Sequence, residues 1–257
     1  MNTTTSDAAE LDLIVPVFNE GPNIARSIEE IDAKVPLRKR ILIVYDFDED
    51  DTLPAVRAMQ PSFPEVQLLK NSYGRGVLNA IRVGIVAATA EVVVITMADL
   101  SDDPAIVPRM VEMIRREGFD IVCASRYVRG GRQIGGPRLK KFLSRMAGYS
   151  LHYLIGLPTH DATNAFRAYR RSVLLDFPIE STGGFEYSLE LTVKAFAAGR
   201  RIGEIPTTWR DRSAGQSRFQ LRKWLPCYLR WYRYALLNRP GRGASISPAP
   251  GPRQCGT

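Results

Sequence analysis

Side chains with metal-binding oxygens directly follow an apolar stretch in the middle of the chain. Residues 92–98 read Val-Val-Val-Ile-Thr-Met-Ala, and Asp99, Ser101, Asp102 and Asp103 come after them. Such a run of β-branched and apolar residues predicts a buried strand with Asp99 at its carboxyl end. Ligands of open α/β sheets bind at that edge. All four side chains offer hard oxygen ligands, which suit Mg²⁺ or Mn²⁺ on a diphosphate, and Asp99 is the first candidate.

Two of these residues also have a simpler interpretation. Ser101 or Asp102 is a suitable N-cap for the helix predicted to begin near Pro104. Asp99 is too far before that helix to cap it, although an acid at a strand end can also stabilise a turn. Capping and ligand binding are therefore both open for Ser101 and Asp102.

The elements that would position these residues alternate along the first half of the chain. Apolar runs predict strands, and periodic apolar residues predict the helices between them. Several strand–helix units in succession predict a parallel, doubly wound sheet with helices on both faces. The expected strands are 11–17, 41–45, 66–70, 92–98 and 120–125, and the expected helices are 22–33, a short one ending near 59, 76–88 and 103–117.

The second half departs from this alternation. Residues 127–137 contain four glycines and predict a mobile loop above the sheet edge rather than a sheet element. Helices are expected at 139–154, 186–198 and 219–237, and one more strand at 202–206. The helix 219–237 mixes Trp and Tyr with Arg and Lys. That composition fits a membrane-interface helix, and aromatic residues at helical spacing fit a protein core equally well.

The net charge of +8 is concentrated in the second half of the chain. A basic surface fits nucleic acid, an anionic membrane or an anionic substrate. No helix-turn-helix, zinc-finger or RNA-binding signature accompanies the charge, so we expect no nucleic-acid partner. The sequence shows neither a secretory signal nor an apolar run of spanning length. We therefore expect a cytoplasmic protein, with any lipid contact peripheral and on the inner face of the membrane.

The expected domain boundaries follow from composition. Residues 1–10 are polar and acidic, and residues 238–257 are rich in Pro, Gly and Ser, which predicts disorder at both ends. Between them we expect a single α/β domain, 11–218, followed by the amphipathic helix 219–237. A chain of this length can bury a full hydrophobic core.

Seven segments carry the chemistry in order along the chain. They are Val15–Glu20, Asp46–Thr52, Lys70 with Gly74–Gly76, Ala98–Ser101, Ser125–Tyr127, Asp161–Arg171 and Asp211–Arg218. Together they resemble the inverting family-two nucleotide-sugar glycosyltransferases, in particular the dolichyl-phosphate mannosyltransferase and polyprenyl-phosphate glycosyltransferase group. Seven segments in the right order are far more specific than any single motif. The resemblance implies a GT-A-type single domain with a mostly parallel, Rossmann-like central sheet flanked by helices.

The resemblance also implies a role for individual residues. The metal site for Mg²⁺ or Mn²⁺ on the donor diphosphate corresponds to Asp99, followed by Ser101. The predicted nucleotide site, which holds base, ribose and phosphate, consists of Pro16, Phe18, Glu20, Tyr45, Asp46 and Gly76. The residues expected to bind anionic groups of donor and acceptor are Arg126, Lys140, Ser144, Arg145, Arg212 and Ser217. The predicted catalytic residues are Asp99, Arg126 and Arg212.

Two positions depart from the pattern of that family. The family usually has Asp-Asp at the end of the second strand and Asp-X-Asp at the metal site, and here Tyr45 and Met97 replace the first member of each pair. A thioether is a poor ligand for Mg²⁺ or Mn²⁺. Asp102 or Asp103 is a candidate for the missing carboxylate, and weak metal binding is the alternative. Tyr45 is able to stack on the nucleotide or to hydrogen-bond to it.

The leading hypothesis is transfer of a hexose, with inversion, from a donor of the GDP-mannose or UDP-glucose type to a polyprenyl or dolichyl phosphate. A phosphate acceptor is already anionic, so its oxygen attacks the anomeric carbon without a general base. Positioning and neutralisation of the leaving nucleoside diphosphate would then supply the catalysis. The two histidines, His152 and His160, are accordingly interpreted as packing or surface residues.

Three other functions are compatible with the same segments. A soluble or glycan hydroxyl acceptor would need a carboxylate base, for which Asp161 and Glu186 are the candidates. A non-catalytic nucleotide-sugar-binding regulator is the hypothesis that Tyr45 and Met97 favour. A nucleotidyltransferase shares the nucleotide-binding logic, but the second half of the chain fits the lipid-phosphate transferases better.

Overall fold

The computed structural model describes residues 9–211, 221–238 and 240. Most of the two predicted disordered ends, 1–10 and 238–257, lies outside these ranges, as do Arg212 and Ser217. Within the described ranges, no helix combines the length and the apolar composition needed to cross a membrane.

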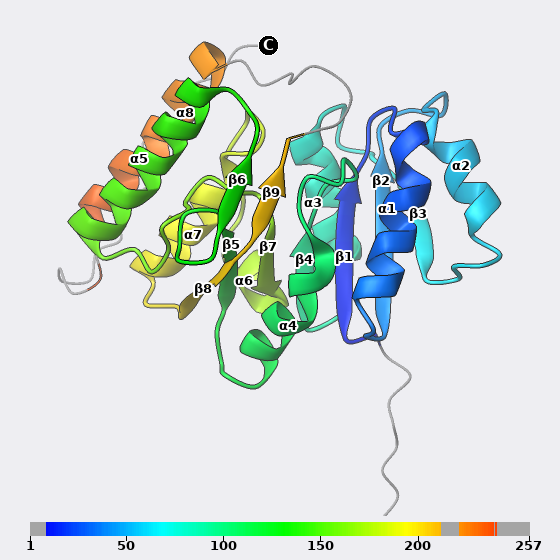
Figure 1. Cartoon of the computed structure of the whole chain (residues 1–257), viewed down its shortest axis with the longest axis horizontal. Coiled ribbons are helices and arrows are strands. Elements are labelled where there is room, and N and C mark those ends of the chain that lie inside the picture. Colours follow the sequence, from blue (N-terminus) through cyan, green and yellow to red (C-terminus); the bar gives the residue numbers. More distant parts are fainter. Residues whose placement is uncertain (1–8, 212–220, 239, 241–257) are drawn as a thin grey trace, which may run out of the picture.

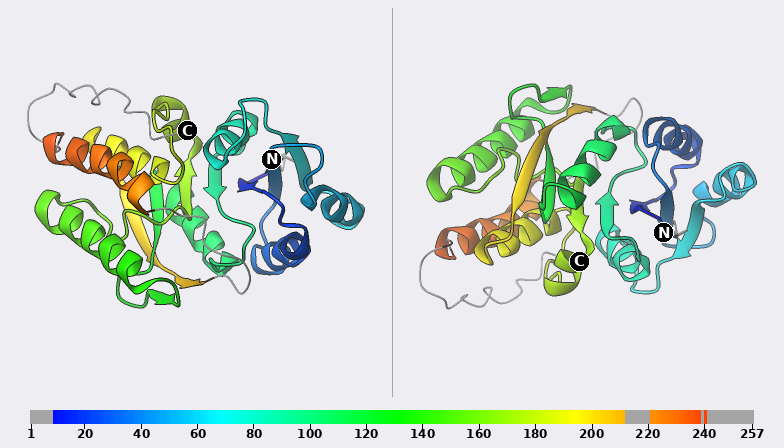
Figure 2. Two further views of the ribbon diagram at one scale, coloured as in Figure 1. Left: turned by 90° about the horizontal axis from the view of Figure 1, so that it is seen from above. Right: turned by 90° about the horizontal axis from the view of Figure 1, so that it is seen from below.

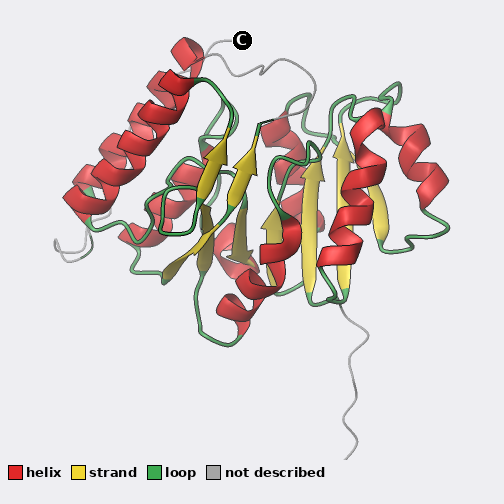
Figure 3. Ribbon diagram, viewed as in Figure 1, coloured by secondary structure: helices red, strands yellow, loops and turns green. Residues whose placement is uncertain are grey.

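The described chain forms two sheets with helices around them (Figures 1 and 3). The strands are β1 (Leu11–Pro16), β2 (Lys39–Tyr45), β3 (Val66–Lys70), β4 (Val92–Ile95), β5 (Ile121–Ser125), β6 (Arg132–Ile134), β7 (Arg167–Arg170), β8 (Ile202–Pro206) and β9 (Thr208–Arg210). The helices are α1 (Gly21–Lys34), α2 (Thr52–Met59), α3 (Val77–Ala87), α4 (Val107–Arg115), α5 (Arg138–Ile155), α6 (Arg171–Asp176), α7 (Tyr187–Ala197) and α8 (Leu221–Leu237), with a 3₁₀ helix, η1, at Pro104–Ile106.

The larger sheet has the strand order β3-β2-β1-β4-β7-β5-β8, and all of its neighbouring strands are parallel except those that flank β7. Successive side chains of a strand point to opposite faces. Leu11, Leu13 and Val15 of β1 pack with α1, α2 and α4, whereas Ile14 packs on the other face with α3, α6 and α7. Both faces are therefore covered by helices (Figure 2), and the expected doubly wound, mostly parallel architecture is confirmed.

The antiparallel strand β7 was not expected from the sequence. It lies between β4 and β5, and it pairs Ala168 with both Val94 and Val122. Its four residues, Arg-Ala-Tyr-Arg, are too short and too polar at their ends to give a strand pattern. Because β7 runs against its neighbours, the residues that precede it, rather than those that follow it, lie at the carboxyl edge of the parallel strands.

The glycine-rich segment 127–137 is not only a loop. Its residues 132–134 form β6, which pairs in parallel with β9 as a separate small sheet. Gly131 is required at the entry to β6, because a Cβ there would lie 2.4 Å from the carbonyl oxygen of Ser125. The prediction of a mobile loop is wrong for β6, and the prediction that the segment stays out of the main sheet is correct.

Helix α8 contributes its described aromatic residues to the core. Trp231 and Tyr234 are buried in a cluster with α5 and α7. The indole Nε1 of Trp231 donates a hydrogen bond to Ser181 Oγ at 2.9 Å, and Tyr232 donates one to Ser150 Oγ at 2.9 Å. For these residues the core interpretation is correct, and the membrane-interface interpretation is wrong.

Candidate functional site

The loops that follow β1 and β4 each contain a residue in the left-handed backbone conformation. Asn19 has φ 53° and Leu100 has φ 58°, and no other non-glycine residue in the described ranges has a positive φ. Since β1 and β4 are adjacent parallel strands, the two turns lie at the same edge of the sheet. Backbone strain of this kind concentrates at functional sites. The turns therefore mark the carboxyl edge as a candidate site independently of any side chain.

The turn at Leu100 folds Asp99 back onto Ser101. Asp99 Oδ1 accepts hydrogen bonds from the backbone N of Ser101 at 3.1 Å and from its Oγ at 2.6 Å. The carbonyl oxygen of Ser101 accepts a hydrogen bond from the backbone N of Arg210, the last residue of β9, at 2.8 Å. Ser101 thus orients the Asp99 carboxylate and ties its turn to the small sheet.

The helix cap in this region is Asp103 rather than Ser101 or Asp102. Asp103 Oδ1 accepts a hydrogen bond from the backbone N of Ala105 at the start of η1. It also forms an ion pair with Lys34 of α1 at 3.1 Å. The capping interpretation is therefore wrong for Ser101 and Asp102, and Asp103 has a structural role that leaves it a poor substitute for the missing carboxylate.

Asp102 lies between the Asp99 turn and Arg126. Its Oδ1 is buried and has no hydrogen-bond partner in the part of the chain that the structure describes. Burial raises the pKa of the Asp102 carboxyl to about 7, with the positive charge of Arg126 opposing the rise and the negative charge of Asp99 adding to it. A buried carboxyl oxygen without a partner is a group that a bound cation can satisfy.

The oxygens of Asp99, Ser101 and Asp102 fit a divalent metal ion that is shared with a substrate. Mg²⁺ on a diphosphate needs only one or two carboxylates, because phosphate oxygens and water complete its coordination. No group of three or more His, Cys, Asp or Glu residues able to hold a metal occurs among the described residues. Met97 adds no hard ligand. An ion that arrives with a diphosphate would need no more than the oxygens of Asp99, Ser101 and Asp102 from this part of the chain.

The predicted nucleotide residues gather around the ends of β1 and β2. Asp46, which directly follows β2, accepts a hydrogen bond from Asn71 Nδ2 at 2.7 Å on Oδ1 and one from the Gly76 backbone N at 2.8 Å on Oδ2. Asn71 Nδ2 also donates to the carbonyl oxygen of Gly74 at 2.7 Å. Gly76 has φ 129°, a conformation that favours glycine, immediately before α3. Asp46 thus fastens the loop 71–76 across the end of β2.

An exposed aromatic surface lies beside this loop. Phe18 is 41% exposed, and its ring meets Phe47 edge-on with centroids 5.5 Å apart. The guanidinium of Arg75 lies 4.9 Å from the centroid of the Phe47 ring. Flat groups of this kind stack readily on bases. Phe47 and Arg75 were not predicted, although both lie within segments that the sequence singled out.

Several acids of the segment 46–51 join the loops rather than facing a ligand. Asp50 is buried and accepts hydrogen bonds from the backbone N of Asn19 and of Thr52. Asp51 Oδ1 accepts one from the backbone N of Gly21 at 2.9 Å, and Asp48 pairs with Lys70. The excess of acids at this strand end is thus largely explained by loop connections.

Arg126 and Asp161 form a buried ion pair at the ends of β5 and before β7. The guanidinium Nε and Nη2 of Arg126 contact the two carboxylate oxygens of Asp161 at 2.7 and 2.9 Å. The backbone N of Arg126 donates to the same carboxylate at 3.0 Å. Arg126 Nη2 also donates to Ser144 Oγ at 3.3 Å and to Thr163 Oγ1 at 3.0 Å. Burial favours the neutral acid, but the Arg126 charge and hydrogen bonds outweigh it and lower the pKa of Asp161.

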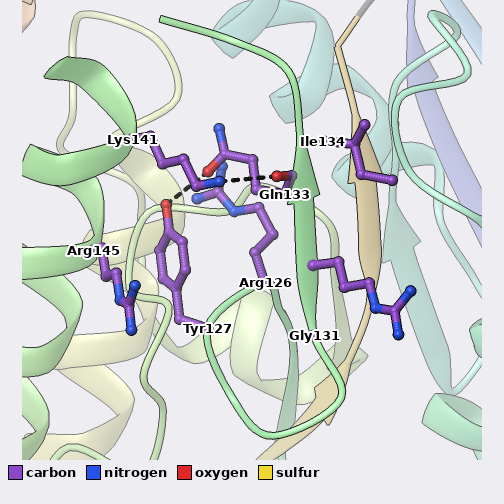
Figure 4. A pocket seen from close by; sticks show the side chains of 8 residues that line it. Arg126, Tyr127, Gly131, Gln133, Ile134, Lys141 and Arg145 are labelled. Atoms are coloured by element: carbon purple, nitrogen blue, oxygen red, sulfur yellow. Dashed lines mark hydrogen bonds between the residues drawn. The ribbon is translucent and has the colours of Figure 1, made fainter. Parts of the chain in front are cut away.

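A basic pocket of about 380 Å³ opens on Arg126. Figure 4 shows Arg126 and Tyr127 rising side by side toward Gln133 of β6, with Lys141 and Arg145 contributed by α5. The Tyr127 hydroxyl contacts Gln133 Oε1 at 3.0 Å, and Lys141 Nζ donates to the Gln133 carbonyl oxygen at 3.0 Å. Gly131, Arg132 and Ile134 complete the lining. The pocket therefore combines four cationic side chains with polar hydrogen-bonding groups, as an anionic ligand requires.

The structure brings together three of the four predicted acceptor residues that lie within the described ranges. Arg126 and Arg145 line the pocket, and Ser144 lies next to Arg126 and contacts the Tyr127 hydroxyl at 2.5 Å. Lys140 is not part of the lining, whereas Lys141 is. The helical period places neighbouring residues about 100° apart, so the sequence identifies the basic helix but not which of its lysines faces inward.

The two carboxylates proposed as general bases for a hydroxyl acceptor are already engaged. Asp161 is paired with Arg126 and is fully buried. Glu186 is also buried, and its two oxygens accept hydrogen bonds from the backbone N of Gly183 and Gly184 at 2.8 and 2.7 Å. The pKa of Asp161, lowered by the Arg126 charge, makes this carboxylate a poor proton acceptor at neutral pH.

The histidines pack against each other rather than facing the pocket residues. The rings of His152 and His160 are stacked with centroids 3.9 Å apart, and His160 Nδ1 contacts Glu204 Oε2 at 2.7 Å. Gly148 lets α5 approach this segment closely, since a Cβ there would lie 2.0 Å from the carbonyl oxygen of His160. The packing interpretation of the histidines is confirmed.

Solved structures share this fold. Glucosyl-3-phosphoglycerate synthase from Mycobacterium tuberculosis, in complex with Mn²⁺, UDP and glucosyl-3-phosphoglycerate, superposes with a TM-score of 0.64 at 19% identity, over 93% of this chain and 82% of that one. The complex of that protein with Mg²⁺ and UDP gives a TM-score of 0.64 at 20% identity, with the same coverage. The mostly parallel sheet with its flanking helices is therefore a GT-A-like fold.

The family follows from the sequence match. A model described as glycosyl transferase family 2 matches residues 12–177, and the chain belongs to this family. It is a glycosyltransferase, and it resembles the polyprenyl-phosphate mannosyltransferases.

Two curated relatives illustrate that resemblance. The dolichol-phosphate mannosyltransferase of Pyrococcus furiosus is 28% identical over 82% of this chain, and the match spans only 59% of that protein. The undecaprenyl-phosphate mannosyltransferase of Micrococcus luteus is 28% identical over 80% of this chain and 85% of its own length.

Proposed function

We propose that the protein transfers a hexose from a nucleoside-diphosphate sugar to a polyprenyl phosphate, with inversion at the anomeric carbon and with a divalent metal ion on the donor. The observation that carries the proposal is the basic pocket around Arg126, whose lining residues include no carboxylate. The Asp99 turn is tied to the β6 side of this pocket through β9, which hydrogen-bonds to Ser101 and pairs with β6. Such a pocket suits a phosphate acceptor and not a hydroxyl that must lose a proton. The names of the relatives support a lipid phosphate as acceptor and mannose as the transferred sugar.

The donor would bind across the ends of β1, β2 and β4. Pro16, Glu20, Tyr45 and Asp46 lie at the two strand ends where base and ribose are expected, and the loop 71–76 is held beside them by Asp46. The Asp99 turn would hold the metal ion on the diphosphate. That ion supplies charge neutralisation for the leaving nucleoside diphosphate.

The acceptor phosphate would sit in the basic pocket, with its oxygen directed at the anomeric carbon. In the transfer the new bond joins the phosphate oxygen to that carbon, and the bond to the nucleoside diphosphate breaks on the opposite side. No proton is lost from the acceptor, which agrees with the engaged state of Asp161 and Glu186. The chain then contributes orientation and positive charge. Arg212 and Ser217 remain predicted contributors on the evidence of the resemblance.

The test is calorimetric titration of the wild-type protein and of Asp99→Ala with GDP and UDP sugars, with and without Mn²⁺. Metal-dependent binding of one nucleotide that Asp99→Ala abolishes would support the donor site and identify the base. Radiolabelled sugar transfer to a polyprenyl phosphate then tests the acceptor. Binding that ignores both metal and Asp99, with no transfer, would instead support a nucleotide-sugar-binding regulator, the function that Met97 and Tyr45 favour.

A further inference from the structure

An apolar stripe runs along the outer face of α5. Leu139, Phe142, Leu143 and Met146 are 64%, 60%, 37% and 48% exposed, although all four are large and apolar. Their spacing of three and four residues places them on one side of the helix. The stripe continues to Leu154, which is 57% exposed. Monomeric proteins rarely leave so contiguous an apolar surface open to water without a function.

Helix α8 extends this surface. The two helices lie side by side, and both begin near the edge where the parallel strands end (Figures 1 and 2). Leu225 and Leu229, one helical turn apart near the start of α8, are also exposed. The aromatic residues Trp231 and Tyr234, by contrast, face the core. At the end of the helix pair that is closest to the site, the exposed apolar residues are therefore leucines, Phe142 and Met146.

Cationic residues flank the stripe. Successive residues of a helix are rotated by about 100° about its axis. Lys140 therefore lies beside one border of the stripe, and Arg138 and Arg145 lie beside the other. Arg145 also lines the basic pocket. The same helix thus presents apolar side chains outward, cations at their borders and a phosphate-sized basic pocket at its inner side.

We propose that this surface, Leu139, Phe142, Leu143 and Met146 of α5 with Leu225 and Leu229 of α8, docks on an anionic lipid bilayer. Apolar side chains enter the acyl boundary while the flanking cations meet anionic head groups, which is how amphipathic helices lie in a membrane interface. A second copy of the chain is a poorer occupant, since a symmetric contact would bring the cationic borders together. The proposal rests on the proposed function, because docking there places the pocket beside lipid-borne phosphates.

The test uses sedimentation of the full chain with phosphatidylcholine vesicles and with equimolar phosphatidylcholine–phosphatidylglycerol vesicles. The wild-type protein should bind the anionic vesicles and bind the neutral ones weakly. The double variant Leu139→Ser/Phe142→Ser should bind the anionic vesicles about ten-fold or more weakly, because each side chain contributes apolar area. The matched control Val86→Ser/Leu175→Ser removes residues that are 67% and 56% exposed on α3 and α6, away from the stripe, and should bind like the wild type.

Three outcomes would overturn the proposal. These are absence of wild-type binding to anionic vesicles, equal loss of binding in the control, and a change from dimer to monomer in the double variant by light scattering. Circular dichroism and thermal unfolding establish that both double variants are folded.

A second assay separates this inference from the proposed function. Transfer to a short, water-soluble prenyl phosphate without vesicles should be unchanged in the double variant, whereas transfer to vesicle-embedded polyprenyl phosphate should fall. If neither the wild-type protein nor the variants transfer sugar to either acceptor, the proposed function is wrong. Vesicle sedimentation still tests the docking surface in that case.

Discussion

The carboxyl edge of the sheet has an acidic half and a basic half, and both are proposed to bind phosphate groups. Around β1, β2 and β4 the side chains are carboxylates, with Asp46 directly after β2 and Asp99 in the turn that follows β4. Around β5, β6 and α5 they are cations, with Arg126, Lys141 and Arg145 at one pocket. In the proposed reaction both halves bind phosphate. Carboxylates accept a phosphate only if it brings a divalent cation, whereas the arginines accept one that comes without it.

This difference offers a means of keeping donor and acceptor apart. The metal ion on a diphosphate would be attracted by Asp99 more strongly than the complex is repelled by the cations of the basic pocket. A bare phosphate monoester would be repelled by the carboxylates. Asp102 lies at the border, near both Asp99 and Arg126. The predictions below disturb one half at a time.

The largest effect is expected at the metal turn. Asp99→Ala should reduce kcat/KM by about 10³-fold, because it removes the carboxylate that holds the ion at the leaving diphosphate. Asp103→Ala is the control nearby, since Asp103 caps η1 and pairs with Lys34. It should lower stability by about 1 kcal/mol and leave kcat near the wild-type value. Steady-state transfer kinetics and thermal unfolding measure both. Equal losses of activity in the two variants would contradict the assignment.

The next effect concerns the ion pair on the basic side. Asp161→Asn leaves Arg126 buried without its counter-charge and should destabilise the protein by about 3–5 kcal/mol. The matched control is Asp12→Asn at the opposite edge of the sheet, where Arg40 contacts both carboxylate oxygens at 2.7 Å. Chemical denaturation should show similar losses for both. At a temperature where both variants are folded, only Asp161→Asn should reduce transfer. Equal transfer activities of the two variants would contradict a role of Arg126 in the acceptor site.

The pocket lysine should affect the acceptor alone. Lys141→Ala is expected to raise the KM for a short, water-soluble prenyl phosphate by about ten-fold, because one charge-assisted contact is lost. The KM for the sugar nucleotide should change by less than about two-fold. Lys140→Ala, one position along the same helix and outside the pocket lining, is the control. An increase in the donor KM, or the same effect from both lysines, would argue against an acceptor pocket at this place.

A smaller effect is expected from adding a carboxylate to the acidic side. Met97→Asp places a hard ligand next to the Asp99 turn and should tighten Mn²⁺ binding in the presence of nucleotide by about five- to ten-fold. Calorimetry with Mn²⁺ and the donor nucleotide measures the change. Met97→Leu, which changes no ligand, should leave the affinity unaltered. Weaker binding in Met97→Asp would mean that residue 97 does not face the metal.

The smallest effect is a pH dependence of stability in the metal-free protein. The pKa of Asp102 is raised to about 7 in the folded protein, so between about pH 4 and pH 7 the folded state holds a proton that the unfolded state has lost. Stability therefore falls as the pH rises through this window. The lowered pKa of Asp161 acts oppositely and only at acidic pH, where stability falls as the pH falls. Denaturation of Asp102→Asn should lack the decline toward pH 7, on the order of 1 kcal/mol.

The acidic half could be predicted more fully than the basic half, and the reason is local. The strands β1 to β4 are apolar runs followed by polar clusters, so the sequence places Asp46 and Asp99 beyond the carboxyl ends of strands without tertiary information. Strand β4 itself ends at Ile95, three residues before the end of the predicted strand 92–98. The pairing of Arg126 with Asp161 spans 35 positions and depends on β7, whose four residues carry no strand pattern. Similarly, β6 and β9 have three residues each, and they form because they pair with each other, not because their residues favour strands.

The sequence also could not predict the role of each residue within a correctly predicted segment. Composition could not separate the core-facing Trp231 from an interface residue, because the choice depends on which face of α8 meets α5 and α7. The left-handed Leu100 likewise has no signature, since leucine rarely adopts that conformation. What decides it is the contact of Ser101 with Asp99 and with β9.

The reversal of β7 also has a practical consequence for attaching probes. The chain after β7 leaves at the opposite edge of the sheet, where the backbone N of Arg171 donates to the Glu91 carbonyl oxygen and Arg170 pairs with Glu91. Turns at that edge, such as the one at Gly118, carry none of the predicted site residues. A fluorophore, an affinity tag or an inserted domain placed there would leave both phosphate sites and the α5 surface unobstructed.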